Sequence, residues 1–346
     1  MMDVSKRVIA GAWLTVNRKC NFRCPWCYAE GTEYKQEDEM SFSLAKDLTN
    51  ILKTAGVKQI TIIGGEPTLW NPIFEYNQFC RDQGIRTTMP TNGLRFADDD
   101  FFEKYKKSPN DLVGISLKAG NQKQLKDSIG CDKFDDLKKG IVRVCSNFDS
   151  AISLTYNTLY ENNLPEIVQF AIDCGAKGIK IDFCSTVFEN GKAKSNYMVP
   201  PKKLISNILR DYEKIYKITN HIIFEMSIPF CLWPRDFIKD LIEKGQIVSI
   251  CQIIKRNAVI FNTDGKLQMC NSLFDYPIGK YKEDFYDAET LLNFLNCPQN
   301  IKYYDALSCY PSLKCRDCEW YSACGGGCPL RWAVYKPNEI LKWKEV

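Results

Sequence analysis

The sequence predicts an α/β protein: a partial (β/α)6 barrel of the TIM type, followed by a small cysteine-rich domain with a β-hairpin. Short β-type runs alternate with amphipathic helical stretches through about the first two hundred residues, as expected of repeated βα units and a parallel sheet. After about Pro200 the alternation stops and a cysteine-rich segment follows. The chain has 346 residues, 45% of them hydrophobic, enough for one large and one small domain. We expect a barrel domain over residues 1–220 and a linker region with the cysteine-rich domain over 221–346.

Six barrel strands are expected from the β-type runs, and the helices between them from amphipathic stretches, several of which end at a glycine suited to a left-handed cap. The strands are Ile9–Val16, Gln59–Ile63, Arg86–Met89, Leu112–Leu117, Ala151–Tyr156 and Gly178–Cys184. The helices are Ser43–Ala55, Ile73–Gln83, Asp98–Lys106, Phe134–Asn147 and Leu164–Cys174, with a later helix near Lys202–Lys217 and a strand near Ile222–Ser227. In such barrels the chemistry lies at the C-terminal ends of the strands.

Composition excludes several classes of protein. No apolar run reaches membrane-spanning length, and residues 1–7 precede an apolar stretch too short for a signal peptide, so a cytoplasmic protein without a membrane partner is expected. The 17 cysteines then favour metal–thiolate sites over disulfides. The formal charge of +4 counts those cysteines as neutral, although cysteines that bind metal do so as thiolates. The positive formal charge is therefore no evidence for a nucleic-acid partner.

The most informative motif is a C-x3-C-x2-C run formed by Cys20, Cys24 and Cys27, directly after the first predicted strand. Three thiolates can hold a [4Fe–4S] cluster whose fourth iron stays open to a small molecule. The alternatives are three buried structural cysteines or a partial zinc site. With Trp26 before the third cysteine, the motif resembles that of the radical S-adenosylmethionine (SAM) enzymes. The resemblance implies that SAM binds the open iron and that its reductive cleavage releases a 5′-deoxyadenosyl radical.

A second motif, Gly64-Gly65-Glu66-Pro67, follows the second predicted strand. Its glycines permit close approach of the backbone to a ligand. It resembles the GGEP motif of the same family, whose backbone holds the methionine ammonium group. Its place one βα unit after the cysteine triad makes a weak motif specific.

Four further residues are candidates for SAM binding. Ser116, at the end of the fourth strand, matches the family position that contacts the SAM carboxylate or ribose. Asn92 and Asn157 follow the third and fifth strands and are expected at the mouth of the barrel, although turn chemistry explains both equally well. Tyr28 resembles the aromatic residue that packs near the adenine, and core packing is its alternative role.

The C-terminal cysteines read C-x13-G-x4-C and then C-x2-C-x5-C-x3-C, with a hairpin turn at 262–265 that places Cys270 at a strand end. The pattern resembles the SPASM extension, which carries two auxiliary [4Fe–4S] clusters; a zinc ribbon is the alternative. The resemblance assigns one cluster to Cys251, Cys270 and Cys328, and the other to Cys315, Cys318 and Cys324.

One auxiliary ligand is left unassigned, because no cysteine follows Cys328 where the family usually has a seventh. Cys309 is a substitute for that ligand, and Cys231 is a candidate to complete the first auxiliary cluster; otherwise one iron is open. The other cysteines are expected to be small buried hydrophobic residues. They are Cys80, Cys131, Cys145, Cys174, Cys184 and Cys297.

The resemblance implies an enzyme, in which the cofactor performs the radical chemistry and the protein positions the substrate. Relatives of this type mostly modify peptides or proteins, so we expect oxidative modification or cross-linking of a ribosomally made peptide, with a flavodoxin or ferredoxin as electron donor. The sulfatase-maturase branch has an aspartate base where this chain has Asn271, which cannot accept a proton as a carboxylate does. Formylglycine formation, dehydrogenation of a small metabolite and a non-catalytic electron carrier are the alternatives. The first strand begins almost at the N-terminus, so leader binding would need a separate partner or none. No catalytic residue is identified.

Overall fold

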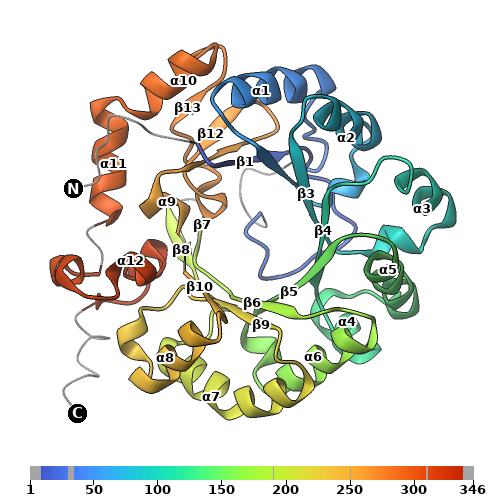
Figure 1. The fold of residues 1–346 in the computed structure, drawn as a ribbon, viewed down its shortest axis with the longest axis vertical. Coiled ribbons are helices and arrows are strands. Elements are labelled where there is room, and N and C mark those ends of the chain that lie inside the picture. Colours follow the sequence, from blue (N-terminus) through green and yellow to red (C-terminus); the bar gives the residue numbers. More distant parts are fainter. Residues whose placement is uncertain (1–8, 30–34, 190, 250, 309–310, 338–346) are drawn as a thin grey trace.

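A computed structural model describes residues 9–29, 35–189, 191–249, 251–308 and 311–337. Its centre is one sheet with the strand order β10-β9-β6-β5-β4-β3-β2-β1-β11-β12-β13. Figure 1 looks along the barrel: the strands curve around the centre, and α1 to α8 cover them from outside. The predicted α/β fold with a partial barrel is thereby confirmed.

The six predicted barrel strands are all present and pair in parallel in sequence order. They are β1 (Gly11–Thr15), β2 (Gln59–Ile63), β3 (Arg86–Thr91), β4 (Leu112–Leu117), β5 (Ser150–Tyr156) and β6 (Ile179–Phe183). Because parallel strands all point the same way, the loops that follow them converge at one edge of the sheet.

The sheet continues beyond the six strands, contrary to the expectation that the alternation stops near Pro200. β9 (Ile222–Glu225) pairs in parallel with β6, and β10 (Ile247–Val248) with β9. At the other edge, β11 (Ala258–Phe261) pairs in parallel with β1 and starts the predicted hairpin with β12 (Lys266–Gln268). Strand β13 (Gly279–Lys280) follows antiparallel to β12. The domain boundary near residue 220 stays a prediction.

Helices α1 to α3 and α5 to α7 agree with the predicted ones to within one or two residues at each end, whereas α4 and α8 were not predicted. The eight are α1 (Phe42–Thr54), α2 (Ile73–Asp82), α3 (Asp99–Tyr105), α4 (Gln122–Ile129), α5 (Phe134–Asn147), α6 (Leu164–Asp173), α7 (Pro201–Ile218) and α8 (Arg235–Glu243). The C-terminal part adds α9 (Gln252–Lys255), α10 (Ala288–Leu295), α11 (Pro298–Ser308) and α12 (Tyr321–Cys324). A separate hairpin is formed by β7 (Val187–Glu189) and β8 (Lys192–Lys194). No helix in the described part of the chain has the length and apolarity to cross a membrane.

The two faces of the barrel strands differ in burial. In β4, Val113, Ile115 and Leu117 are fully buried toward the helices, while Gly114 and Ser116 alternate with them and are half-buried. Since successive strand residues point to opposite faces, the second set faces the barrel interior. At β4 the interior face thus carries small residues that are partly exposed.

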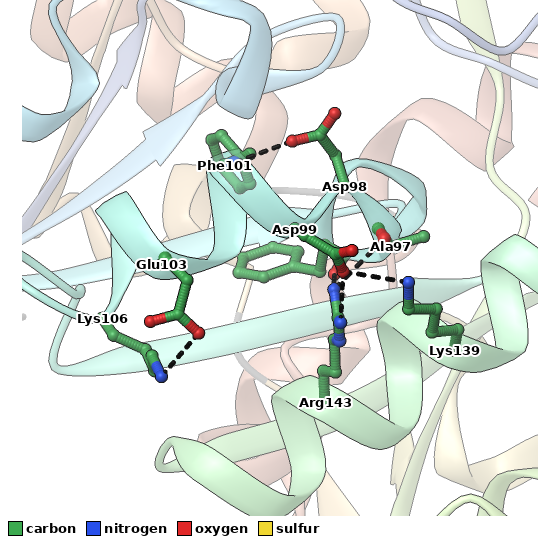
Figure 2. Close-up of polar contacts among 9 residues, drawn as sticks. Ala97, Asp98, Asp99, Phe101, Glu103, Lys106, Lys139 and Arg143 are labelled. Carbon is green, nitrogen blue, oxygen red and sulfur yellow. Dashed lines mark hydrogen bonds and ion pairs between the residues drawn. The ribbon is translucent and has the colours of Figure 1, made fainter.

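Local polar contacts fix the outer helices (Figure 2). The side chain of Asp98 caps α3 by accepting a hydrogen bond from the N–H of Phe101 at 2.7 Å. Asp99 pairs with Lys139 at 3.0 Å and with Arg143, both on α5. These exposed ion pairs orient α3 on α5 and add little to stability.

Candidate active site at the ends of the barrel strands

The cysteines of the C-x3-C-x2-C motif lie on the loop after β1, and all three thiols are half-buried. The N–H of Phe22 donates to Cys20 Sγ at 3.4 Å, and the N–H of Cys27 donates to the carbonyl of Cys24 at 2.9 Å. Burial, followed by the charge of Glu66, raises the pKa of Cys20 to about 12, and the nearby Cys24 and Cys27 add to the shift. Three neighbouring thiol donors fit the ligand set of a [4Fe–4S] cluster with one open iron.

Both glycines of the GGEP turn pack against the backbone of this cysteine loop. A methyl group on Gly64 would lie 2.3 Å from Asn17 Oδ1, and one on Gly65 would lie 2.4 Å from the Arg18 carbonyl oxygen. The N–H of Gly65 donates to the Asn17 carbonyl at 3.0 Å, and that of Glu66 also donates to the loop. The close approach that was expected toward a ligand is therefore made toward the cysteine loop. Because these amide hydrogens serve the loop, the turn can offer a ligand carbonyl oxygens, which are the acceptors that an ammonium group needs.

The carboxylate of Glu66 is buried and engaged within the protein. Its two oxygens accept four hydrogen bonds: from the N–H and hydroxyl of Thr68 at 3.1 and 2.7 Å, the hydroxyl of Thr91 at 2.6 Å, and the N–H of Asn92 at 2.8 Å. It thereby caps the 3₁₀ helix η2 (Pro67–Leu69), in which Pro67 is buried. The side chain of Glu66 thus joins the turns after β2 and β3, and its carbonyl oxygen is engaged as well, since it accepts from Asn17 Nδ2 and from the N–H of Leu69, both at 3.0 Å.

Asn92 extends this connection to the cysteine loop. Its side-chain N–H donates to Asn21 Oδ1 at 2.7 Å, while its own Oδ1 accepts from the N–H of Leu94 at 3.0 Å. The three loops after β1, β2 and β3 are therefore hydrogen-bonded to one another through Glu66 and Asn92. Asn92 acts as a link between loops.

Ser116 and Asn157 differ in what they can offer a ligand. Ser116 faces the barrel interior, where its hydroxyl accepts from Lys118 Nζ at 2.6 Å. Asn157 is fully buried; its Oδ1 accepts from the N–H of Leu159 at 2.9 Å, and its Nδ2 donates to the Thr155 carbonyl at 3.1 Å. Both ends of the Asn157 side chain thus serve the local backbone, which is the turn chemistry that had been left open.

Tyr28 lies between the two cysteine-rich regions. Burial raises the pKa of its hydroxyl to about 12, against the effect of Arg18. The charges of Cys27, Cys20 and also Cys270 raise it further, so Tyr28 is near the first motif and near the C-terminal segment.

The set assigned to the first auxiliary cluster is brought together. Burial raises the pKa of Cys270 to about 12, with Cys328 as the next cause and Cys251 also contributing. Burial likewise raises the pKa of Cys251 to about 11, again with Cys328 next. The N–H of Cys328 donates to the Ser227 carbonyl at 2.9 Å, which attaches this cysteine to the segment after β9.

The second set is more exposed. The N–H of Cys318 donates to the Cys315 carbonyl at 3.3 Å, and Cys315 is among the groups that raise the pKa of Cys324, after burial. Cys324 Sγ accepts from the N–H of Phe230 at 3.3 Å, and Phe230 directly precedes Cys231. Cys231 was considered for the first auxiliary cluster, but the chain brings its backbone to the second set.

Cys309, the other substitute ligand, lies outside the described residues. Within the described ranges, no group of three or more His, Cys, Asp or Glu side chains is placed to hold a single metal ion. A single zinc ion needs all its sulfur ligands about 2.3 Å from one point. A [4Fe–4S] cluster binds each thiolate at a different iron, which spaces the sulfurs more widely.

Motif reasoning missed a charged group on the inner faces of β6 and β9. Lys180 Nζ lies 3.0 Å from Asp182 Oδ1 and 2.6 Å from Glu225 Oε2. Asp182 and Glu225 are direct neighbours across the two strands. The alternation of Lys180 and Asp182 with buried apolar residues was a usable signal, since residues two apart in a strand share a face. Their partner Glu225 was not accessible to local reasoning.

We expect Asp182→Asn to stabilise the protein in a pH-dependent way. Burial, followed by the charge of Glu225, raises the pKa of Asp182 from 3.8 to about 7. The native state thus holds this proton where the unfolded chain has lost it, so the stability contributed by Asp182 is complete below about pH 4 and is lost as pH rises to about 7. Asparagine cannot ionise. The melting temperature of the Asp182→Asn variant should therefore exceed that of the parent by a small amount at pH 4.5 and by the largest amount at pH 7 to 8.

The pH dependence of this difference in melting temperature is measured by thermal unfolding, monitored by circular dichroism at matched iron content. Lys180 and Glu225 face the same group and stay unchanged in both proteins. An equal difference at all pH values would contradict the raised pKa of Asp182.

Comparisons with known proteins agree with this geometry. The sequence profile described as the Radical SAM superfamily matches residues 14–173. The chain is 28% identical over 179 residues to the probable GTP 3′,8-cyclase of Metallosphaera sedula, covering 51% of this chain and 56% of that protein. It is 33% identical over 102 residues to the Fe-coproporphyrin III synthase of Methanosarcina barkeri, covering 30% of this chain and 25% of that protein. The chain thus spans about half or less of the length of these relatives.

Two solved structures share the fold over nearly the whole chain. SuiB of Streptococcus suis, bound to the precursor peptide SuiA, superposes with a TM-score of 0.72 at 18% identity, covering 96% of this chain and 74% of that one. Native anSMEcpe with bound AdoMet gives a TM-score of 0.70 at 17% identity, covering 97% of both chains. The likeness therefore includes the C-terminal, cysteine-rich part.

Proposed function

Because residues 14–173 match the profile of the Radical SAM superfamily, we propose that this protein is an enzyme that cleaves SAM reductively and oxidises a peptide substrate. The observation that carries the proposal is the loop of Cys20, Cys24 and Cys27, hydrogen-bonded to the GGEP turn at the C-terminal end of the sheet. When bound, the cluster and SAM supply the 5′-deoxyadenosyl radical that removes a hydrogen atom from the substrate. The chain itself holds both reactants and excludes water.

Several residues at this edge are assigned to SAM. The backbone of the Gly64–Pro67 turn is assigned to its ammonium group, with the carbonyl oxygens of Gly64 and Gly65 as the acceptors. The hydroxyl of Ser116, together with the neighbouring Lys118 cation, suits its carboxylate or ribose. Tyr28 packs against the adenine. Asn92 holds the loops in place and is a positioning residue.

A peptide is favoured as substrate by two structural neighbours. SuiB was solved with its precursor peptide, and anSMEcpe with bound AdoMet and the Kp18Cys peptide. Both resemble this chain over its full described length, including the segment after the barrel.

The C-terminal cysteines are proposed to form a SPASM-type domain with two auxiliary [4Fe–4S] clusters. Cys251, Cys270 and Cys328 hold the first, and Cys315, Cys318 and Cys324 hold the second. When bound, these clusters would supply an acceptor for the electron that leaves the substrate. A flavodoxin or ferredoxin supplies the electron that starts the reaction, and the enzyme works in the cytoplasm without nucleic-acid or membrane partners.

Cys231 is the proposed fourth ligand of the second auxiliary cluster, since the adjacent Phe230 N–H bonds Cys324 Sγ. Cys231→Ala should therefore leave one iron of that cluster without a protein ligand, so that brief air oxidation of the reconstituted protein removes about one iron atom per chain more than from the parent. Cys145→Ala, on α5, is the matched control and should load fully. If Cys309→Ala loses this iron instead, the ligand is Cys309.

Oxidation of the substrate by two hydrogens also releases a proton. One of the two hydrogens would leave as an atom to the radical that SAM supplies. The other would leave as a proton and an electron, so the chain must provide a base for the proton, and a bound auxiliary cluster would supply the acceptor for the electron. Asn271, which follows Cys270, cannot serve. The carboxylates of Asp182 and Glu225 face the barrel interior and are proposed to accept it, with Lys180 holding both in place.

A small molecule is the second candidate substrate, favoured by the sequence similarity to GTP 3′,8-cyclases. That similarity covers about half of this chain. It bears on the chemistry of SAM more than on the substrate.

Mass spectrometry tests the proposal. The anaerobically reconstituted protein is incubated with SAM, dithionite and candidate precursor peptides, and with GTP in parallel. Loss of two hydrogens from a peptide, together with 5′-deoxyadenosine, supports a peptide-modifying enzyme. Formylglycine formation would instead indicate a sulfatase-maturase-like enzyme, and turnover of GTP alone would indicate an enzyme that acts on a small molecule. Failure to cleave SAM under every condition would contradict the proposed activity and favour a non-catalytic electron carrier.

A further inference from the structure

Arg331 is a buried cation three residues after Cys328. Its side chain is 2% exposed. Nε donates to the Ser227 hydroxyl at 3.1 Å, and Nη2 donates to the Cys184 carbonyl at 2.6 Å. Among the described residues, Nη1 has no hydrogen-bond partner. A guanidinium has five N–H donors, so donors of this group remain available to a further hydrogen-bond acceptor.

No carboxylate balances the charge of Arg331 in the described part of the chain. Burial lowers its pKa, and the groups that oppose this shift are Cys328 first, then Cys184 and Tyr335. Arginine stays protonated in proteins, and a buried charge is costly unless an anion compensates it. Of these three groups only Cys328 is a proposed cluster ligand, and a cluster ligand binds as a thiolate.

Cys328 also has a polar neighbour in the segment after β6. The Ser185 hydroxyl lies 3.4 Å from Cys328 Sγ and can donate to it when the sulfur is a thiolate. The preceding Gly327 packs so closely that an added methyl group would lie 2.9 Å from the Ser227 carbonyl oxygen. Cys328 is thus held at the ends of β6 and β9, where it and Arg331 both bond Ser227 and the N–H of Arg331 donates to the Cys328 carbonyl at 3.1 Å.

We propose that Arg331 is the counter-cation of the cluster that Cys251, Cys270 and Cys328 hold, and that with Ser185 it raises the reduction potential of that cluster. This inference rests on the auxiliary-cluster assignment of the proposed function. Reduction adds a negative charge to the cluster, and a nearby cation or hydrogen-bond donor stabilises the reduced form. The first auxiliary cluster is thereby a better electron acceptor than it would be without Arg331. Arg331 acts through the cluster as a positioning residue and touches no substrate.

The test is a redox titration followed by electron paramagnetic resonance. The background is the full chain with Cys20, Cys24 and Cys27 replaced by alanine, so that only auxiliary clusters remain. Arg331→Gln should lower the reduced-to-oxidised ratio of one cluster about tenfold at a fixed potential, a shift of about 59 mV for one electron. Arg331→Lys should keep most of the parent potential. The exposed Arg81→Gln, on α2, is the control and should shift neither cluster.

Ser185→Ala provides the independent variant, because it removes one hydroxyl at a half-buried position. We expect a smaller shift in the same direction. Full iron content with unchanged potentials in Arg331→Gln overturns the inference; if that variant does not fold, unchanged potentials in Ser185→Ala overturn it. If the background protein binds no iron, the auxiliary-cluster assignment itself is refuted, and the inference with it. Iron content therefore separates the two failures.

Discussion

Replacing Cys24 with alanine should abolish the formation of 5′-deoxyadenosine. Cys24 is the middle of three thiols, and its carbonyl accepts the N–H of Cys27, so no neighbouring cysteine replaces it without rebuilding the loop. With two thiolates left, the first cluster is not retained, and about four iron atoms per chain should be lost. Product formed from SAM and dithionite, measured by liquid chromatography, should fall to the level of a reaction without protein.

The control for this experiment is Cys145→Ala, which removes a thiol from α5, away from all three cysteine sets. It should keep both its iron and its activity. The C-terminal cysteines should still load in Cys24→Ala, since Cys251, Cys270 and Cys328 form their own group. Undiminished 5′-deoxyadenosine in Cys24→Ala would refute the assignment of the open-iron cluster to this motif.

The second large effect is expected on stability. Glu66→Ala removes a buried carboxylate that accepts four hydrogen bonds from Thr68, Thr91 and Asn92, and it leaves their donors without partners. We expect the free energy of unfolding to fall by about 4 kcal/mol, since charged hydrogen bonds and buried unsatisfied groups each contribute one to three. That is a large part of the stability of an ordinary domain. Urea unfolding of the anaerobically purified protein measures it.

Glu75→Ala is the matched control, because Glu75 is exposed in the first turn of α2. Its effect should stay within about 1 kcal/mol. Iron loading adds a second measurement. Glu66 and Asn92 connect the turns after β2 and β3 to the cysteine loop, so Glu66→Ala should also load the first cluster incompletely. Equal stability of the two variants would show that the carboxylate network is unimportant.

Local sequence patterns were sufficient to predict many strands and helices of this protein and the loops that carry its motifs. The bounds of β2, β4 and α5 follow from runs of apolar residues and from helical periodicity, which act over a few residues. The cysteine spacing and the GGEP turn are equally local, and they named the loops that meet at the end of the sheet. A metal or cofactor motif is short because one loop supplies most of its contacts.

Long-range contacts set the rest. β11 lies beside β1 although nearly 250 residues separate them, and no short pattern specifies such a pairing. The sequence predicts a role in SAM binding for the backbone of the GGEP turn, whereas only the structure reveals that the Glu66 side chain accepts hydrogen bonds from Thr91 and Asn92 of the next βα unit. The Lys180–Asp182–Glu225 group and the counter-cation Arg331 exist only once β6, β9 and the C-terminal segment are packed together. Charge and hydrogen bonding act through space, so these sites depend on neighbours that the order of residues does not reveal.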